Sequence, residues 1–432
     1  MTRPITKLGA EKTWREAFTD FAAAPAWLAP KRKQAFQRFE ERGLPTPRTE
    51  DWRWSDIHRH LNDSFPPLTG GEKGGDVGDV LAAQPFAAVD AHLLVFVDGR
   101  LDREASRIGS EEGLSILSLA ETESMPAWAD AALSAGEDAI DLLNLAYVTD
   151  GALIHVAEGV ALKRPVVIVN VATAPGRSMA LRHVIRLEKG ARLSLHEVQA
   201  GGGHNVSLQA TVADLAEEAE LVRIQVAGRD DEAITFANLQ AQVASRAALK
   251  DLTVIHGGRL HRQQDFVDLA GEGAEAEVNA AYLLRHAQHA DTRLVVNHLV
   301  PHGTSRETFK CVMDDQARGA FQGRIHVAPG AQKTDGQMAA HGLLLGEMAE
   351  FDAKPELEIY ADDVICAHGA TAGALDEEQL FYLRARGIPI AQARAMLIAA
   401  FVAETFDAIE DETVRNALQA LAQNWLAGEE AA

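Results

Sequence analysis

Cys366 and His368 are the side chains whose types and spacing most directly suggest chemistry in this chain. They lie within residues 357–373, where alternating, strand-like residues give way to a Gly/Ala/Thr turn and then to a helical pattern. In an extended segment, residues two apart point to the same face. The thiol and the imidazole are therefore expected side by side, which leaves a soft metal site, a nucleophile pair or a packed polar edge as interpretations.

A metal site at this position needs further ligands. A thiolate and a neutral imidazole suit iron, zinc, copper(I) or an iron–sulfur cluster, but two ligands are too few for a closed site. Cys311 is the only other cysteine of the sequence. The remaining ligands must come from elsewhere in the fold or from another chain. Taken alone, the pair is more typical of a structural cysteine beside a turn histidine.

Two other groups of polar residues invite a functional interpretation. Six histidines fall within 47 residues, without the spacing of a zinc motif, so we expect surface or packed side chains: His256, His261, His286, His289, His298 and His302. The acid pairs Asp314–Asp315 and Asp362–Asp363 raise the alternative of a carbohydrate-active enzyme. Adjacent carboxylates on a strand point to opposite faces, so solvated turn acids are the simpler interpretation.

Residues 152–365 read as a long series of short strands separated by Gly-containing turns. A weak repeat runs through them with spacings of 28, 28 and 27 residues, each unit placing an apolar or small residue two positions after an alanine: Ala191 and Leu193, Ala219 and Leu221, Ala247 and Leu249, Ala274 and Ala276. A repeat of strands and turns predicts a parallel β-helix, with a two-sheet sandwich as the alternative.

Helical patterns flank these strands. We expect an N-terminal helical region and linker (1–80), a mixed strand and helix lead-in (81–150), the β-helix core (151–370) and a C-terminal helical region (371–432). Trp52 and Trp54 are expected to anchor the N-terminal region on the core. Asp376 is a predicted N-cap. The helix after Pro389 is expected to bury one apolar face: Ile390, Ala393, Leu397, Ala400 and Phe401.

Composition excludes several classes. The formal net charge of −22 argues against nucleic acid and membrane surfaces as main partners. Two widely spaced cysteines favour a reducing compartment, and neither a secretory signal nor a membrane-spanning run is evident, so a cytoplasmic protein is expected. The sequence contains no Walker A, GxGxxG or GxSxG pattern, so we expect neither a P-loop nor a serine hydrolase.

Residues 306–388, which include LEIYADDVICAHGATAG, resemble the C-terminal core of the SufB/SufD family of the Suf iron–sulfur cluster assembly machinery. Weaker similarity covers residues 150–169, 97–101 and 48–54. The resemblance implies a β-helix core with helical regions at both ends. It also implies a complex with a SufB-like subunit and a SufC-like ATPase.

The sequence Cys366-Ala367-His368-Gly369 has glycine where SufB-type chains carry glutamate. The resemblance therefore implies a non-catalytic subunit that holds iron or a cluster only transiently, through His368 and Cys366 at the SufB-like interface. It implies an ATPase-docking surface on the C-terminal helices, for which we name Phe381, Tyr382, Leu397 and Phe401. No cofactor is expected to bind the isolated chain tightly.

Several alternatives stay open at this stage. A SufB-like scaffold and a β-helix carbohydrate-active enzyme are the competing functions. A homodimer of the isolated chain and a flavin in the assembled complex are further alternatives that the sequence does not decide.

Overall fold

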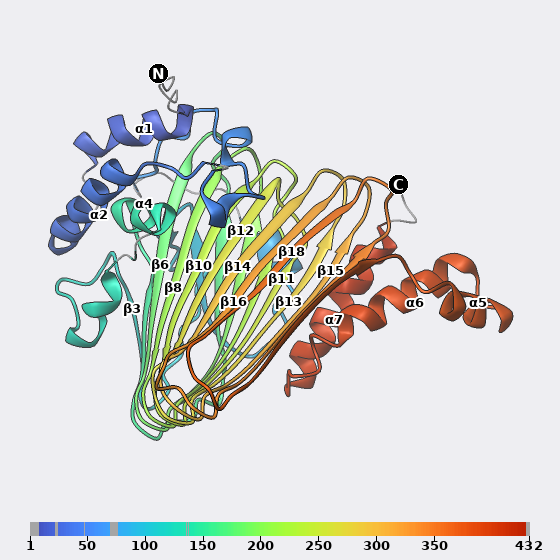
Figure 1. The fold of residues 1–432 in the computed structure, drawn as a ribbon. Helices are drawn as coiled ribbons and strands as arrows, with labels where there is room; N and C mark the ends of the chain where they lie inside the picture. Colours follow the sequence, from blue (N-terminus) through green and yellow to red (C-terminus); the bar gives the residue numbers. More distant parts are fainter. Residues whose placement is uncertain are drawn as a thin grey trace, which may run out of the picture.

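The computed structural model describes residues 8–21, 25–46, 48–69, 77–134, 136 and 138–428. Two long sheets face each other and form a flattened solenoid (Figure 1). From β4 onward, successive strands alternate between the two sheets, so one coil consists of one strand from each. The predicted fold class, a mainly β parallel β-helix with flanking helices, is confirmed.

Sheet A has nine strands in the order β18-β16-β14-β12-β10-β8-β6-β4-β3. They are β3 (Leu114–Ser118), β4 (Ala152–Val156), β6 (Ser178–Leu187), β8 (Val206–Leu215), β10 (Ile234–Val243), β12 (Leu260–Leu269), β14 (His289–His298), β16 (Arg318–Val327) and β18 (Glu350–Ile359). Sheet B has ten, in the order β19-β17-β15-β13-β11-β9-β7-β5-β1-β2. They are β1 (His92–Val97), β2 (Arg100–Leu101), β5 (Val166–Ala172), β7 (Arg192–Gly201), β9 (Glu220–Ala227), β11 (Ala248–Ile255), β13 (Glu275–Leu284), β15 (Thr304–Met313), β17 (Asp335–Leu344) and β19 (Ile365–Gly373).

The sequence repeat corresponds to the register of sheet B. Leu193, Leu221, Leu249 and Ala276 are direct neighbours on β7, β9, β11 and β13, all in parallel pairing. The alanines two residues earlier are fully buried at the start of each coil. The column continues through Ser305 and Gly336 to Cys366. A coil of nearly constant length therefore places each apolar residue above its counterpart.

The interior of the solenoid is not uniformly apolar. Arg223 is buried between Glu197 and Asp251, with its Nη1 2.8 Å from an Asp251 oxygen and its Nε 2.7 Å from a Glu197 oxygen. Gln263 donates a 2.6 Å hydrogen bond to Asp265, which is also buried. Partnered charges of this kind resist removal, because loss of one partner leaves the other uncompensated in a medium of low polarity.

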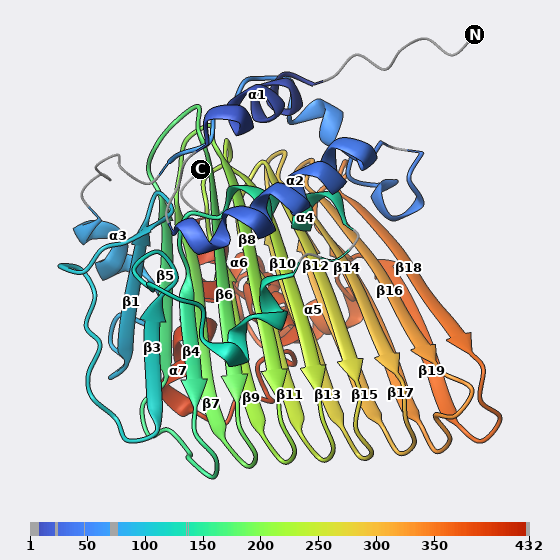
Figure 2. The same ribbon diagram turned by 90° about the vertical axis from the view of Figure 1, so that its left-hand side faces the viewer.

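The N-terminal helices cover the outer face of sheet A (Figure 2). These are α1 (Gly9–Ala17), α2 (Ala29–Arg42) and α4 (Ala139–Tyr147), with short 3-10 turns at Phe18–Asp20, Ala26–Leu28, Glu50–Trp52, Ile57–Arg59, Ala127–Ala129 and Ala131–Leu133. Trp52 is buried beneath the Arg262 guanidinium, 4.7 Å from the ring centre, and Trp54 is half-buried. The expected anchoring role is confirmed for Trp52.

The linker expected before residue 80 is partly packed structure. Phe65 and Leu68 are buried, and Leu68 donates a backbone hydrogen bond to Ser178 on sheet A. Residues 70–76 of the same stretch lie outside the described residues, and α3 (Gly78–Ala83) follows. Composition alone predicted a linker because glycines dominate the second half of the stretch, whereas the first half carries the buried apolar side chains.

The C-terminal region contains α5 (Glu377–Ala385), α6 (Ile390–Ala403) and α7 (Glu412–Ala427). Asp376 caps α5 as predicted, accepting hydrogen bonds from the backbone N–H groups of Glu378 and Gln379. The face predicted for α6 is wrong in part, since Ile390 and Ala400 are exposed and the buried residues are Ala393, Ile398 and Val402. Nearly every residue of α6 is apolar, so its sequence does not select one face.

No helix among the described residues has the length and apolar content needed to cross a bilayer.

The buried Asp265 should make stability depend on pH. Burial, reinforced by Asp251, raises its pKa from 3.8 to about 7, so the folded chain holds a proton that the unfolded chain has released. Stability is therefore lost as the pH rises from about 4 to 7. Asp265→Asn mimics the protonated form, and its stability advantage over wild type should grow by about 2 kcal/mol between pH 5.5 and 8.5 in denaturant titrations.

Asp407→Asn is the matched control, because Asp407 is exposed on the loop between α6 and α7. Its difference from wild type should be the same at both pH values. If the difference in unfolding free energy between Asp265→Asn and wild type is also the same at both pH values, the folded chain does not hold a proton on Asp265.

Candidate functional site

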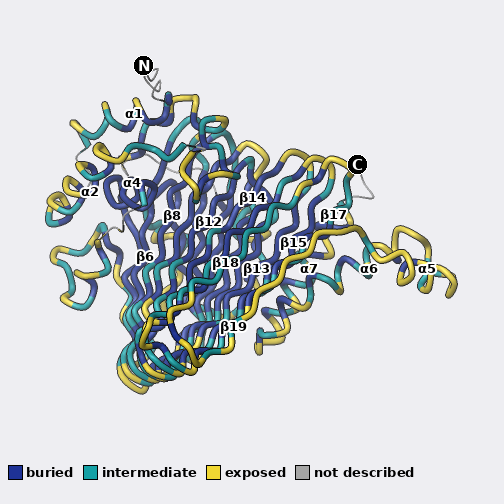
Figure 3. The backbone as a smooth tube through the Cα atoms, viewed as in Figure 1, coloured by how far each residue is buried: buried dark blue, intermediate teal, exposed yellow. Residues whose placement is uncertain are grey.

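Cys366 and His368 lie on β19, the strand at one edge of sheet B. Parallel pairing places Cys366 beside Gly336 and His368 beside Met338 on β17. Figure 3 shows β19 as an exposed strand at the end of the solenoid. Cys366 is half-buried against the interior core, whereas His368 is exposed. The two residues occupy alternate positions of one strand, as predicted from their spacing.

The thiol of Cys366 is not activated in this structure. Burial raises its pKa, the neighbouring carboxyl groups of Asp335 and Glu307 add to that effect, and a hydrogen bond from the Gly336 backbone acts in the opposite direction. The neutral thiol is thus favoured at neutral pH. A cation that approached the thiol would reverse this preference, because metal ligation requires the thiolate.

Glu307 is a buried carboxyl group that the sequence analysis did not identify. It shares one register column with His368, separated from it by Met338 on β17. Burial raises the pKa of Glu307 to about 8. The pairing register is the signal that could have located it, because Glu307 lies 31 residues before Met338, close to the repeat length.

The open edge of β19 presents unpaired backbone groups. The Ile365 N–H donates to the Thr334 carbonyl, next to β17. In a parallel sheet, alternate residues bond to opposite neighbours. The N–H groups of Cys366, His368 and Ala370 therefore point away from β17, toward the open edge. Within the described residues, β18 and β19 each pair on one side only, as do β3 and β2 at the opposite ends of the two sheets.

The terminal coil does not form a closed metal site by itself. No group of three or more His, Cys, Asp or Glu side chains among the described residues is arranged to hold a metal ion. Cys366 and His368 thus supply two ligands of the soft type, next to an edge at which a second chain could supply more.

The six clustered histidines do not form one site. His261 and His298 are buried inside the solenoid, and His289 is buried 6.4 Å from the ring of His60. The others lie near the turns: His256 is partly buried, while His286 and His302 are exposed near Asp231 and Glu272 respectively. The interpretation of packed or surface histidines is confirmed. The acid pairs at 314–315 and 362–363 likewise lie in turns between strands.

The residues named for ATPase docking occupy two environments. Phe381 and Tyr382 on α5 are 73% and 57% exposed. Leu397 and Phe401 on α6 are half-buried, and the Phe401 ring lies 4.8 Å from the Lys310 ammonium of β15. The structure brings the first two together on a projecting helix, and places Phe401 at the contact between α6 and sheet B.

Family models match most of the chain. The model described as "SUF system FeS cluster assembly, SufBD core domain" matches residues 170–401, and the one described as "SufBD protein N-terminal region" matches residues 21–168. With its two-sheet solenoid and flanking helices, the chain belongs to the SufBD family.

Among its relatives, the iron–sulfur cluster assembly protein SufD of Escherichia coli is 31% identical over 406 residues, which cover 91% of this chain and 92% of that protein. SufD of Bacillus subtilis is 24% identical, over 96% of this chain and 97% of that protein. A SufBD family protein of Synechocystis is 27% identical, over 88% of this chain and 87% of that protein. These relatives are named for assembly rather than for an enzymatic activity.

Alkylation should report the environment of Cys366. Because its thiol pKa is raised, iodoacetamide should modify native Cys366 several-fold more slowly than a free thiol at pH 7.5. Cys311 is fully buried and should react only after denaturation. Asp335→Asn removes a negative neighbour and should speed the reaction of Cys366, as followed by mass spectrometry of the intact protein.

Asp362→Asn is the control for that comparison, since Asp362 is exposed on the turn before β19. It should leave the rate unchanged. If the two substitutions change the alkylation rate of Cys366 equally, the Asp335 carboxylate does not raise the pKa of the thiol.

Proposed function

We propose that this chain is a non-catalytic subunit of a Suf iron–sulfur cluster assembly complex. It pairs with a SufB-like subunit through the coil formed by β18 and β19, and it docks a SufC-like ATPase on its C-terminal helices. ATP-driven movement of those helices assists cluster assembly or iron entry at the paired edge. One observation carries the proposal: Cys366 and His368 lie together on an edge strand with unpaired backbone groups.

The edge of sheet B is suited to pairing, and the edge of sheet A is less so. Proteins commonly protect edge strands with lysine, proline or charge. β18 carries Lys354, Pro355 and four acidic residues, whereas β19 has the sequence ICAHGATAG, which contains no Asp, Glu, Lys, Arg or Pro. Addition of a strand from another chain would satisfy the free N–H and C=O groups of β19.

The soft ligands support a transient role in handling the cargo. Iron or the nascent cluster is the cargo of such a complex, and thiolate and imidazole are ligands that suit it. Two ligands from this chain leave room for ligands from a SufB-like partner. A scaffold that builds a cluster alone is less well supported, because Gly369 supplies no carboxylate and Cys311 is buried in the core.

The C-terminal helices supply a surface for the ATPase. Exposed aromatic residues such as Phe381 and Tyr382 are typical anchors of protein interfaces. Phe401 on α6 and Glu404, the residue that follows this helix, both contact Lys310 of β15, the carboxylate through an ion pair of 2.5 Å. A displacement of α6 would therefore act on sheet B two strands from β19.

His368→Ala should lower cluster content without preventing complex formation. The chain, its SufB-like partner and its SufC-like partner are co-expressed from the same organism and purified together, and iron and sulfide are measured per complex. Several-fold loss with His368→Ala is expected, because the exposed imidazole is lost while the fold is untouched. Cys366→Ala, measured in parallel, tests the thiol separately. Unchanged cluster content in both variants would make the pair structural.

Ala370→Pro should abolish pairing while preserving the fold. The Ala370 N–H points to the open edge, so proline removes a donor needed by a partner strand and no hydrogen bond within sheet B. Ala370→Ser keeps the donor and is the matched control. Size-exclusion chromatography with the SufB-like partner should show loss of the complex only for proline. Complex formation by Ala370→Pro would mean that β19 is not the pairing edge.

A further inference from the structure

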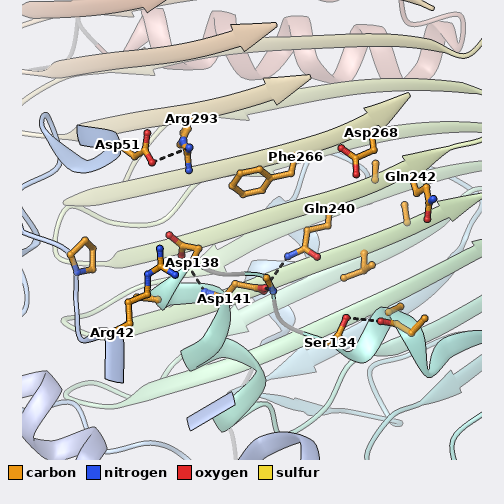
Figure 4. A pocket seen from close by; sticks show the side chains of 18 of the residues that line it. Arg42, Asp51, Ser134, Asp138, Asp141, Gln240, Gln242, Phe266, Asp268 and Arg293 are labelled. Atoms are coloured by element: carbon orange, nitrogen blue, oxygen red, sulfur yellow. Dashed lines mark hydrogen bonds and ion pairs between the residues drawn. The ribbon is translucent and has the colours of Figure 1, made fainter. Parts of the chain in front are cut away.

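A cavity of about 650 Å³ lies between the N-terminal layer and the outer face of sheet A (Figure 4). Its floor is formed by β8, β10, β12 and β14, and its walls by residues near Trp52 and Trp128. The volume falls within the range of about 300–1,000 Å³ that is typical of small-molecule sites. The site is separate from Cys366 and His368, which lie on the edge strand of the opposite sheet.

Aromatic rings from three distant segments line this cavity: Trp52, Trp128 and Phe266. Trp52 is held from the sheet side by Arg262, and Phe266 lies 5.4 Å from the Arg293 guanidinium. Trp128 is half-buried, with its ring 5.5 Å from that of His155. Rings held on one side by other groups provide flat, ordered surfaces against which a planar ligand can stack.

The floor carries a row of hydrogen-bond acceptors. Asp214, Gln242 and Asp268 occupy the same register position on β8, β10 and β12. Asp268 accepts a 2.7 Å hydrogen bond from the Asn297 amide, and Asp214 forms an ion pair with Arg186. Gln242 lies between the two carboxylates and is exposed. In Figure 4, Gln242 and Asp268 are on neighbouring strands beside Phe266.

The formal charge of the lining selects the sign of the ligand. Five aspartates and two arginines line the cavity: Asp51, Asp138, Asp141, Asp214, Asp268, Arg42 and Arg293. Asp51 and Arg293 compensate each other at 2.9 Å. Arg182 compensates Asp141, and Arg186 compensates Asp214, so the remaining excess of negative charge is small and rests on Asp138 and Asp268. This excess disfavours phosphates and other anions and favours cations. Cations also interact favourably with the faces of tryptophan and phenylalanine rings.

From these observations we infer that the cavity binds a flat organic cation that bears N–H donors, of the aminoheterocycle class. The ring system lies against Trp128 and Phe266, and its N–H groups donate to the carboxylates of Asp214 and Asp268. Because the ligand contacts both the N-terminal layer and sheet A, its binding holds the two together.

Calorimetric titration of the full-length chain with proflavine, a planar diamino cation, tests this inference. One molecule should bind per chain, and binding should weaken as salt is added, since charge contributes to it. Acridone has a related three-ring frame without the charge, and 1-anilinonaphthalene-8-sulfonate is an anion. Each should bind at least about tenfold more weakly. Acridone or the anion binding as tightly as proflavine would overturn the inferred charge preference.

Variants locate the binding site. Asp268→Asn keeps an acceptor for Asn297 but removes a charge, and should weaken proflavine binding about fivefold, within the range measured for partly exposed ion pairs. Gln242→Trp fills the cavity from an exposed position and should abolish binding. Asp407→Asn, remote and exposed, should bind as wild type does. Equal affinity in Asp268→Asn and in Asp407→Asn, or retention in Gln242→Trp, would overturn the assignment of the site.

Thermal melts of each variant without ligand accompany the titrations. If Gln242→Trp is unfolded, Gln242→Arg replaces it, because a positive charge at the same exposed position should also exclude the cation. Proflavine binding that Gln242→Arg leaves unchanged would contradict the inference in the same way.

Discussion

Parallel backbone pairing between coils of nearly equal length is the constraint on which the rest of this structure depends. Each strand satisfies the hydrogen-bonding groups of the strand before it, so the chain can add coils but cannot close the sheets. The last coil therefore leaves an edge unpaired, and Cys366 and His368 lie on it. The exposure of His368 and the lack of further ligands follow from this position at the end of the series, whereas the common face of the two side chains follows from their two-residue spacing.

The same register sets what lies inside the solenoid. One column on sheet B includes Arg223 and Asp251, passes through Val278, Glu307 and Met338, and ends at His368. Burial of charge is costly, and here it is offset where ions are paired, as with Arg223, or where a proton is retained, as with Asp265. Such pairing requires that interior polar residues occupy matching register positions on neighbouring strands. The polar pairs therefore specify the strand register more strictly than apolar packing alone would.

Much of the fold could be predicted because the repeat consists of residues that are close together in sequence. Ala191 and Leu193 recur at the coil length, and the spacing of Cys366 and His368 needs no knowledge of tertiary structure. Two features could not be found in this way. The buried face of α6 is set by contacts with sheet B, since almost any face of that helix is apolar enough. The cavity over sheet A combines Trp52, Trp128 and Phe266, which are widely separated in sequence, so only the folded chain reveals it.

The placement of Lys310 links the C-terminal helices to the edge strand. Its ammonium contacts Phe401 on α6 and Glu404 directly after that helix. Lys310 lies on β15, which pairs with β17, and β17 in turn pairs with β19. A force on α6 must either break these contacts or displace the three strands together, because continuous backbone hydrogen bonds make the sheet stiff relative to side-chain contacts. Within the proposed complex, the first outcome would uncouple the ATPase from the cargo site. The second would move Cys366 and His368 as a unit against the partner chain.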